Sequence, residues 1–402
     1  MQSRVMNIVG TLFMAANQWL QVILITRLLG LYEVGLFSYF LALTGPLVLF
    51  ARFSLSRLVP TQTKLSYDYA IFKQFRDITN YGFIFMSLAA VIFIDLTVYE
   101  SICLFFFVLF KFYENKEEFI YTENISESRI SFLALSKIYK SILTIILFTA
   151  SIFIFDSLLM AMVSLLVSQV LIYYFYGLKF TFSPRKPVVK LNSGDFKKIF
   201  ALGIGLSLVE VLSSLVSNVP RYMLEYFHSV ETLGIFATIM YFALITNNIV
   251  FALNEGFIAG LAREARQNIR SFYRSFFKIC GVFLILTAAG EIILILFGND
   301  ILVLVYGEEF MGYQREMLLL GVLLFFIVYT KLFEMALNVL NLYTPQVVMQ
   351  AITFVTTIVL SIAVIIPFGL AGAFIVSIST HLLLLLGQIT ILMYHRKYKV
   401  SI

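Results

Sequence analysis

Rows of polar side chains lie within long apolar stretches of this sequence, at spacings that place each row on one face of a helix. One row follows i, i+3, i+7, i+10, i+14 and comprises Ser207, Glu210, Ser214, Ser217 and Arg221. A second row follows i, i+3, i+7, i+10 and comprises Lys331, Glu334, Asn338 and Asn341. Because lipid offers polar groups no hydrogen-bonding partner, each row must face protein or water. Such rows could bind a polar cargo or a coupling ion inside a membrane.

Two further rows have helical spacing. One is uncharged and comprises Asn7, Gly10, Met14, Asn17 and Gln21. The other comprises Lys111, Glu114, Glu118 and Tyr121. Serine and asparagine also join helices without any further role, but a charge near the bilayer centre costs about 2.5 to 3.5 kcal/mol on insertion scales. That cost favours a functional role for the charged members Lys111, Lys331, Glu210 and Glu334.

Glu210 is the first candidate for ion coupling and Glu334 the second. Glu210 has no basic residue one turn away, so its partner must come from another helix, a substrate cation or a proton. Glu334 stands three residues after Lys331, and the two could instead form a structural pair. His381 is expected to be a hydrogen-bonded packing residue rather than a proton relay.

The chemistry of an enzyme is not expected here. No HExxH or GxxxxGK spacing occurs, and no loop is long enough for an active site outside the membrane. The two cysteines, Cys103 and Cys280, lie inside apolar runs and supply neither a disulfide framework nor a metal site. We therefore expect no metal and no cofactor, apart from H⁺ or Na⁺ as a coupling ion.

The amino-acid composition indicates a membrane protein. The chain of 402 residues is 60% apolar and 13% charged, whereas an ordinary soluble domain has about 25% charged residues. Since a spanning helix needs about 20 apolar residues, the sequence predicts an all-α integral membrane protein with twelve transmembrane helices. They are expected at 5–29, 35–55, 81–98, 101–121, 132–155, 158–178, 199–223, 233–254, 276–297, 317–340, 347–366 and 370–394.

Charge predicts the orientation of these spans. With both termini in the cytoplasm, only Arg27, Arg221 and Arg315 of the 29 basic residues fall at the outer side, while Lys111 and Lys331 lie near mid-span. Lys and Arg are retained in cytoplasmic loops, so the net charge of +6 is a topology signal and no nucleic-acid partner is expected. The sequence predicts a multi-pass protein of the cytoplasmic (inner) membrane.

Two basic segments are expected at the inner membrane surface. The amphipathic residues 67–76 predict an interfacial helix on the inner leaflet. The cytoplasmic connection 263–274 is expected to lie against anionic headgroups.

The chain divides into two similar halves. A polar linker at 181–198 separates an N-terminal lobe, 1–180, from a C-terminal lobe, 199–402, each with six helices. Gly35 and Gly234 follow the first helix of each lobe in similar local sequences, and Arg27 and Arg221 end that helix. Six helices between the copies make a parallel, pseudo-symmetric repeat, and such repeats place a cavity at the interface between lobes.

A resemblance to a known family rests on these features and on three short motifs. The motifs are the Arg-Leu-Leu-Gly turn at 27–30, the run 35–39, and the run 218–222 leading to 233–237. The chain resembles the polysaccharide-transporter branch of the MOP exporter superfamily, the multidrug, oligosaccharidyl-lipid and polysaccharide exporters. In particular, it resembles the Wzx-type flippases of O-antigen and capsule repeat units.

The resemblance implies a MATE-like pair of lobes that moves an undecaprenyl-diphosphate-linked oligosaccharide from the inner to the outer leaflet by alternating access. It implies a basic cavity in which Arg27 and Arg221 match the family's arginines and Lys111 and Lys331 are candidates by position. Asn17, Gln21 and Asn338 complete the predicted cavity. A polysaccharide polymerase and a chain-length regulator are the implied protein partners.

Two alternatives stay open. Glu210, Glu334 and Glu114 depart from a purely cationic cavity, and the same superfamily includes multidrug exporters that exchange Na⁺ or H⁺ for an organic cation. The other alternative is a membrane enzyme such as an O-antigen polymerase, which would be expected to carry a long extracytoplasmic loop. The longest outer connection is about twenty residues.

Overall fold

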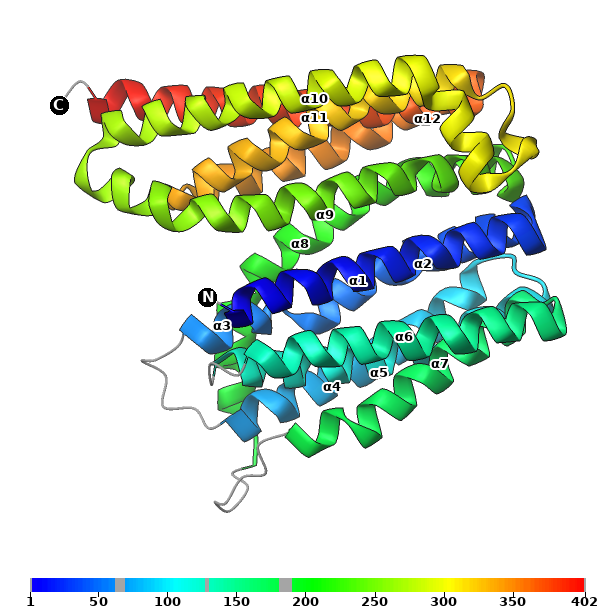
Figure 1. Ribbon diagram of the computed structural model, residues 1–402. Helices are drawn as coiled ribbons and strands as arrows, with labels where there is room; N and C mark the ends of the chain where they lie inside the picture. The colour runs from blue at the N-terminus through cyan, green and yellow to red at the C-terminus, as the bar shows by residue number, and fades with distance from the viewer. Residues whose placement is uncertain (1, 62–68, 127–129, 181–189, 401–402) are drawn as a thin grey trace. The chain divides into compact units, whose positions relative to one another are not determined.

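The computed structural model describes residues 2–61, 69–126, 130–180 and 190–400. These residues form α-helices and three short helical turns, with no strand among them (Figure 1). The elements are α1 Gln2–Leu24, η1 Ile25–Leu29, α2 Leu31–Arg52, α3 Leu55–Thr61, α4 Tyr69–Phe93, α5 Val98–Ser126, α6 Ile130–Phe155, α7 Leu158–Phe175, η2 Gly177–Phe180, α8 Ser193–Phe227, α9 Val230–Gln267, α10 Ile269–Tyr306, η3 Glu308–Phe310, α11 Gln314–Val339 and α12 Tyr343–Val400. The all-α prediction is confirmed, and every predicted span lies largely within these helices.

Within the described residues, nine helices are long and apolar enough to cross a membrane. The difference from the predicted twelve has two sources. The span of 58 residues in α12 contains the last two predicted spans, because its two helices follow each other without a loop. The third and fourth predicted spans lie in α4 and α5, whose apolar runs are interrupted by charge, as at Lys111–Glu118.

The bend in α12 has a local cause. Pro367 lacks an N–H, and Gly369 leaves the helical region with φ 51° and ψ −125°. The ring Nε2 of His228 donates to the main-chain carbonyl of Ile365 at 2.8 Å, beside this bend. A Cβ on Gly369 would come 3.3 Å from the His228 ring, so the histidine packs against the bend.

The chain forms two compact units, residues 1–214 and residues 215–402. Unit 1 contains α1 to α7 and the first part of α8, and unit 2 contains the rest of α8 and α9 to α12. The division falls inside α8, between residues 214 and 215, and so comes later in the chain than the predicted linker at 181–198. Of that linker, residues 181–189 lie outside the described residues.

Aromatic packing joins the first part of α8 to unit 1. The ring of Phe200 lies 5.2 Å from that of Phe53, and the ring of Phe196 lies 5.0 Å from that of Phe75. A Cβ on Gly203 would come within 2.5 Å of the Phe53 ring, so the helix approaches this buried ring as closely as a glycine permits. Because these contacts precede Ser214, the start of α8 belongs to unit 1.

The first turns of α4 correct one prediction. Residues 67–76 were predicted to be an interfacial helix, and of these the structure describes 69–76. Ile71, Phe72 and Phe75 are buried in a protein cluster with Phe53 and Phe119. The apolar face of this segment is therefore covered by protein rather than by lipid.

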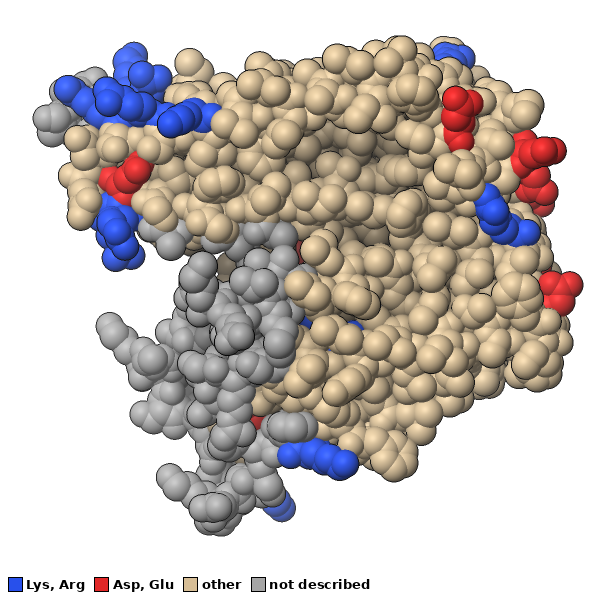
Figure 2. All heavy atoms as spheres, viewed as in Figure 1, with Lys and Arg blue, Asp and Glu red and all other residues tan. Residues whose placement is uncertain are grey.

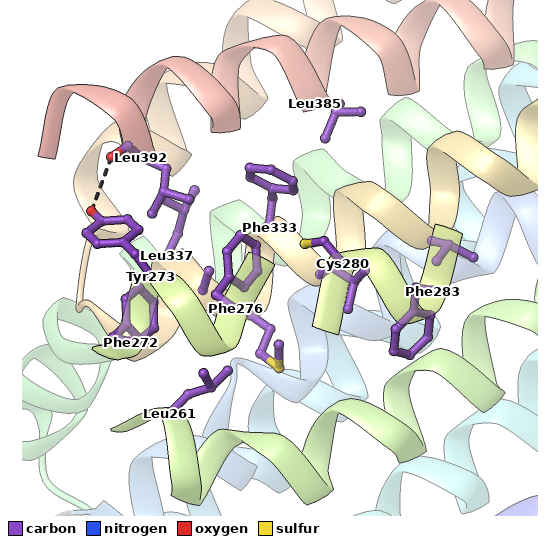
Figure 3. Close-up of a cluster of buried hydrophobic side chains, with 14 of the residues drawn as sticks. Leu261, Phe272, Tyr273, Phe276, Cys280, Phe283, Phe333, Leu337, Leu385 and Leu392 are labelled. Carbon is purple, nitrogen blue, oxygen red and sulfur yellow. Dashed lines mark hydrogen bonds between the residues drawn. The ribbon is translucent and has the colours of Figure 1, made fainter. Parts of the chain in front are cut away.

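Unit 2 has its own hydrophobic core along α9 to α12. Figure 3 shows Phe272, Phe276 and Phe283 of α10 among side chains of the neighbouring helices. The cluster also includes Leu261 of α9, Phe333 of α11 and Leu385 and Leu392 of α12. Figure 2 shows basic side chains gathered at the end of this unit where α9 passes into α10 and where α12 ends.

Candidate functional site

Three cations surround one buried carboxylate on α5. Glu114 lies 2.8 Å from the Nζ of Lys111, 3.5 Å from the Nζ of Lys140 and 3.8 Å from Nη2 of Arg52. These cations come from α5, α6 and α2, so the carboxylate joins three helices. The positive charge around Glu114 exceeds what a single carboxylate neutralises.

A second carboxylate one turn further along α5 is fully surrounded. Glu117 is 1% exposed and accepts from Lys140 at 3.1 Å and from Gln169 of α7 at 2.8 Å. Its other oxygen accepts from Tyr121 at 2.6 Å and from Ser136 at 3.1 Å. Because four donors bind its two oxygens, Glu117 is held in one position, and its role is structural.

The third carboxylate, Glu118, binds the buried Arg76 of α4. Arg76 also donates to the main-chain carbonyl of Ala51 at 3.1 Å. Beside it, Asn115 accepts from Arg52 at 2.9 Å and donates to Asn80 at 3.1 Å. We call the whole set the α5 network: Arg52, Arg76, Asn80, Lys111, Glu114, Asn115, Glu117, Glu118, Tyr121, Ser136, Lys140 and Gln169.

The α5 network has an accessible cationic edge. It contains four cations and three carboxylates, so it carries one excess positive charge at neutral pH. The side chains of Lys111 and Arg52 are 14% and 28% exposed, whereas that of Lys140 is 8% exposed. The Lys111 ammonium also lies 4.9 Å from the ring centroid of Phe110. This edge can bind an anionic group without displacing any carboxylate.

The sequence predicted only part of this network. It placed Lys111, Glu114, Glu118 and Tyr121 on one face, and the structure brings all four into the network. Among the partners that it missed are Arg76 and Lys140, which the predicted topology places on the cytoplasmic side. The available signal was that Glu114, Glu117 and Glu118 crowd one face of the helix, so cations to balance them had to come from other helices.

The other predicted residues of unit 1 lie apart from one another along the chain. Asn17 is half-buried in α1, with its Oδ1 buried and without a hydrogen bond, and Gln21 is buried one turn later. Arg27 is exposed in η1, before Gly30. The side chain of Asn7, the first residue of that row, lies outside the described residues. Glu210 is half-buried in the part of α8 that belongs to unit 1.

Arg221 lies in the part of α8 that belongs to unit 2. Its Nη1 donates to Asn218 at 2.9 Å, while its Nε is buried and has no hydrogen-bond partner. Because a buried donor without a partner is costly, this guanidinium is suited to an incoming acceptor such as a phosphate oxygen. The sequence identified Arg221 from its place in the row, and the structure adds this unsatisfied atom.

The predicted row on α11 forms an ion pair and exposes its end. Lys331 and Glu334 are 2.8 Å apart, with side chains 37% and 41% exposed, as expected for a pair at i, i+3. The main-chain carbonyl of Lys331 accepts from Asn254 at 3.3 Å. Asn338 is exposed and accepts from Gln346 at 3.1 Å. The predicted pairing is thus confirmed, and its functional role stays a prediction.

Sequence reasoning also missed Glu291, a single carboxylate in the apolar run of α10. The carboxylate lies against Gly321 of α11, where any larger residue would meet it. Its isolation between Gly290 and Ile292 was the available signal. The predicted hydrogen bond of His381 is present, since its Nδ1 lies 3.0 Å from the carbonyl of Ser377 on the same helix. Within the described residues, no group of His, Cys, Asp or Glu could hold a metal ion.

Comparison with known proteins gives one curated relative and several solved structures. No family model matches the sequence. The chain is 25% identical over 325 residues, 75% of its own length and 77% of the relative's, to the capsular polysaccharide biosynthesis protein CapF of Staphylococcus aureus.

The solved structures share its fold at low identity. The lipid II flippase MurJ in an inward closed conformation matches with a TM-score of 0.80 and 13% identity, over 97% of this chain and 87% of MurJ. A multidrug resistance MATE family transporter of the MOP superfamily, in an outward-facing conformation, matches with a TM-score of 0.67 and 14% identity, over 100% of this chain and 97% of the transporter.

Proposed function

We propose that this chain, whose fold is similar to that of a MATE family transporter of the MOP superfamily, is a flippase for a lipid-linked oligosaccharide. The proposed cargo is an undecaprenyl-diphosphate-linked repeat unit of a capsule or O-antigen. The protein would move it from the inner to the outer leaflet of the cytoplasmic membrane by exposing its binding residues alternately to the two sides.

The observation that carries this proposal is the cationic edge of the α5 network. Three cations meet at the single carboxylate of Glu114, and two of them, Lys111 and Arg52, are partly exposed. An excess of positive charge inside membrane helices favours an anionic cargo over an organic cation. A diphosphate supplies that charge, and a guanidinium holds phosphate oxygens in a bidentate manner.

The comparisons support the same cargo class. The name of CapF refers to capsular polysaccharide biosynthesis, and the name of MurJ refers to a flippase of a lipid. A chain that combines likeness to both fits a step in which a lipid-linked saccharide crosses the membrane. Transport by a flippase makes and breaks no covalent bond of the cargo, in keeping with a chain that is not an enzyme.

We assign roles to the predicted residues within this proposal. Arg221, through its unsatisfied Nε, and Arg27 would receive the diphosphate, with Lys331 as a further cation. Asn17, Gln21 and Asn338 would donate to and accept from sugar hydroxyls. Glu210 and Glu334 would exchange the coupling ion, H⁺ or Na⁺. A polymerase and a chain-length regulator would take over the product at the outer leaflet.

A multidrug exporter of organic cations is the second candidate, favoured by the MATE likeness. Its coupling or cargo carboxylate would be Glu210 or Glu334. Glu334 already pairs with Lys331, which weakens its attraction for an organic cation. The flippase therefore remains the proposed function.

Complementation tests the proposal. In cells that build a surface polysaccharide from lipid-linked units and lack their own flippase, this chain should restore the surface polysaccharide. Lys111→Met should reduce that restoration at least tenfold at unchanged membrane abundance, whereas Lys73→Met, at an exposed lysine of the same unit, should not. Failure of the unmodified chain, combined with resistance to cationic dyes, would favour the multidrug exporter instead.

A further inference from the structure

We propose that unit 2 carries a separate binding site for the phosphate headgroup of an anionic membrane lipid. The site is a pocket of about 360 Å³ between the start of α10 and the end of α12. It is lined by Arg270, Tyr273, Arg274, Phe277 and Arg396. The pocket shares no residue with the α5 network or the row on α11, and its function is independent of the proposed flippase cargo.

The floor of the pocket is fixed by hydrogen bonds and packing. The Tyr273 hydroxyl lies 3.3 Å from the carbonyl of Leu392 and 3.0 Å from Nδ1 of His395, so it ties α10 to α12. Figure 3 shows this bond beside Phe272 and Phe276, which belong to the hydrophobic cluster of unit 2. The arginines thus project from helices whose spacing is already set, which lowers the entropy lost on binding.

One arginine is held in place by the same tyrosine. The guanidinium carbon of Arg396 lies 5.5 Å from the ring centroid of Tyr273, in cation–π range. Arg270 and Arg274 stand one helical turn apart on α10 and line the same pocket. Three arginines from two helices therefore line one pocket.

These three charges lack a protein counter-ion among the described residues. No ion pair of Arg270, Arg274 or Arg396 occurs there, and no carboxylate lines the pocket. Positive charges that line one pocket repel each other, so an anion that enters gains attraction and offsets this repulsion. The planar guanidinium fits two phosphate oxygens at once. The pocket chemistry therefore favours a phosphate group.

The surroundings of the pocket favour a phosphate that is attached to a lipid. Phe277, at the rim, is 47% exposed. About two turns further on, the same face of α10 continues through Leu284, 50% exposed, and Ile285, 72% exposed. Exposed apolar side chains in a transmembrane helix face acyl chains. A headgroup in the pocket would thus leave its acyl chains on an apolar surface that begins at Phe277.

Lipid binding to the purified full-length protein tests this site. Delipidated protein in detergent would be titrated with phosphatidylglycerol, and bound lipid counted by native mass spectrometry. Arg274→Gln/Arg396→Gln should weaken the tightest binding at least tenfold. The matched control is Arg263→Gln/Arg266→Gln, which removes two exposed arginines of α9 outside the pocket and should change it less than twofold.

Three results would overturn the proposal. Equal weakening by the two variants would mean that any basic residue at this end suffices. Equal binding of zwitterionic phosphatidylcholine would remove the need for net negative charge. Full competition by inorganic phosphate, at the concentrations at which phosphatidylglycerol binds, would mean that the pocket binds free phosphate rather than a lipid headgroup. If the glutamine variant aggregates, Arg274→Lys/Arg396→Lys replaces it, because lysine keeps the positive charge but has no planar guanidinium. Unchanged phosphatidylglycerol binding by the lysine variant would contradict the guanidinium assignment.

Discussion

The substitution Glu114→Gln tests the α5 network most sharply, because it removes one charge that three cations share. At an effective dielectric constant of about 20, the attraction between Glu114 and Lys111 at 2.8 Å is about 6 kcal/mol. The attractions to Lys140 at 3.5 Å and Arg52 at 3.8 Å are each between about 4 and 5 kcal/mol. The desolvation of all four groups offsets most of this energy.

The net loss is therefore set by the charges that are left without a partner. Lys140 keeps Glu117 at 3.1 Å, but Lys111 has no other carboxylate within ion-pair distance among the described residues. Breaking a buried pair by removing one partner costs about 3 to 5 kcal/mol. At about 2 to 4 °C per kcal/mol for a domain of about 200 residues, the midpoint of thermal unfolding should fall by roughly 6 to 20 °C.

The assay is thermal unfolding of the detergent-solubilised protein, followed by the fraction that remains monodisperse in size-exclusion chromatography. A double variant, Glu114→Gln/Lys111→Met, should recover part of the loss because it removes the stranded ammonium. A Glu114→Gln protein with an unchanged midpoint would refute the reasoning, and so would a double variant less stable than the single one.

The remaining predictions concern α8, α11 and α12. Arg221→Ala should reduce surface polysaccharide at least tenfold at normal membrane abundance, and Arg221→Lys should restore only part of it. Normal export by Arg221→Ala would mean that the arginine serves only as an anchor at the membrane interface. Glu210→Gln should make flipping insensitive to the proton gradient in vesicles, and flipping that still follows the gradient in this variant would remove Glu210 from the coupling. Gly372→Ala should lower stability by about 1 to 3 kcal/mol in thermal unfolding, because its Cβ would come 2.5 Å from a main-chain oxygen. Gly281→Ala, with open space around it, is the matched control and should not.

Hydropathy was sufficient to predict the positions of the helices, because each long apolar run must be buried in either lipid or protein. It could not give the division between units, which depends on how Phe53 and Phe75 of the N-terminal helices pack against Phe200 and Phe196 of α8. Such contacts join residues more than a hundred positions apart, and no periodicity within one helix encodes them.

The same limit applies to the site. The pairs Lys111–Glu114 and Lys331–Glu334 were predictable because i, i+3 residues are neighbours on any helix. The burial of Arg76 was not predictable, since its partner Glu118 is on another helix and its local sequence has the pattern of an interfacial helix. A local pattern shows that a face is apolar, but not whether lipid or protein covers it.

Reconstituted transport tests the central claim most directly. Vesicles containing the purified chain would be loaded with a fluorescent undecaprenyl-diphosphate oligosaccharide, and its movement between leaflets followed by quenching with a membrane-impermeant reagent. The account predicts that the chain accelerates this movement at least tenfold over protein-free vesicles, that Lys111→Met abolishes most of the gain, and that ethidium, an organic cation, is not transported. Transport of ethidium without movement of the lipid would contradict it.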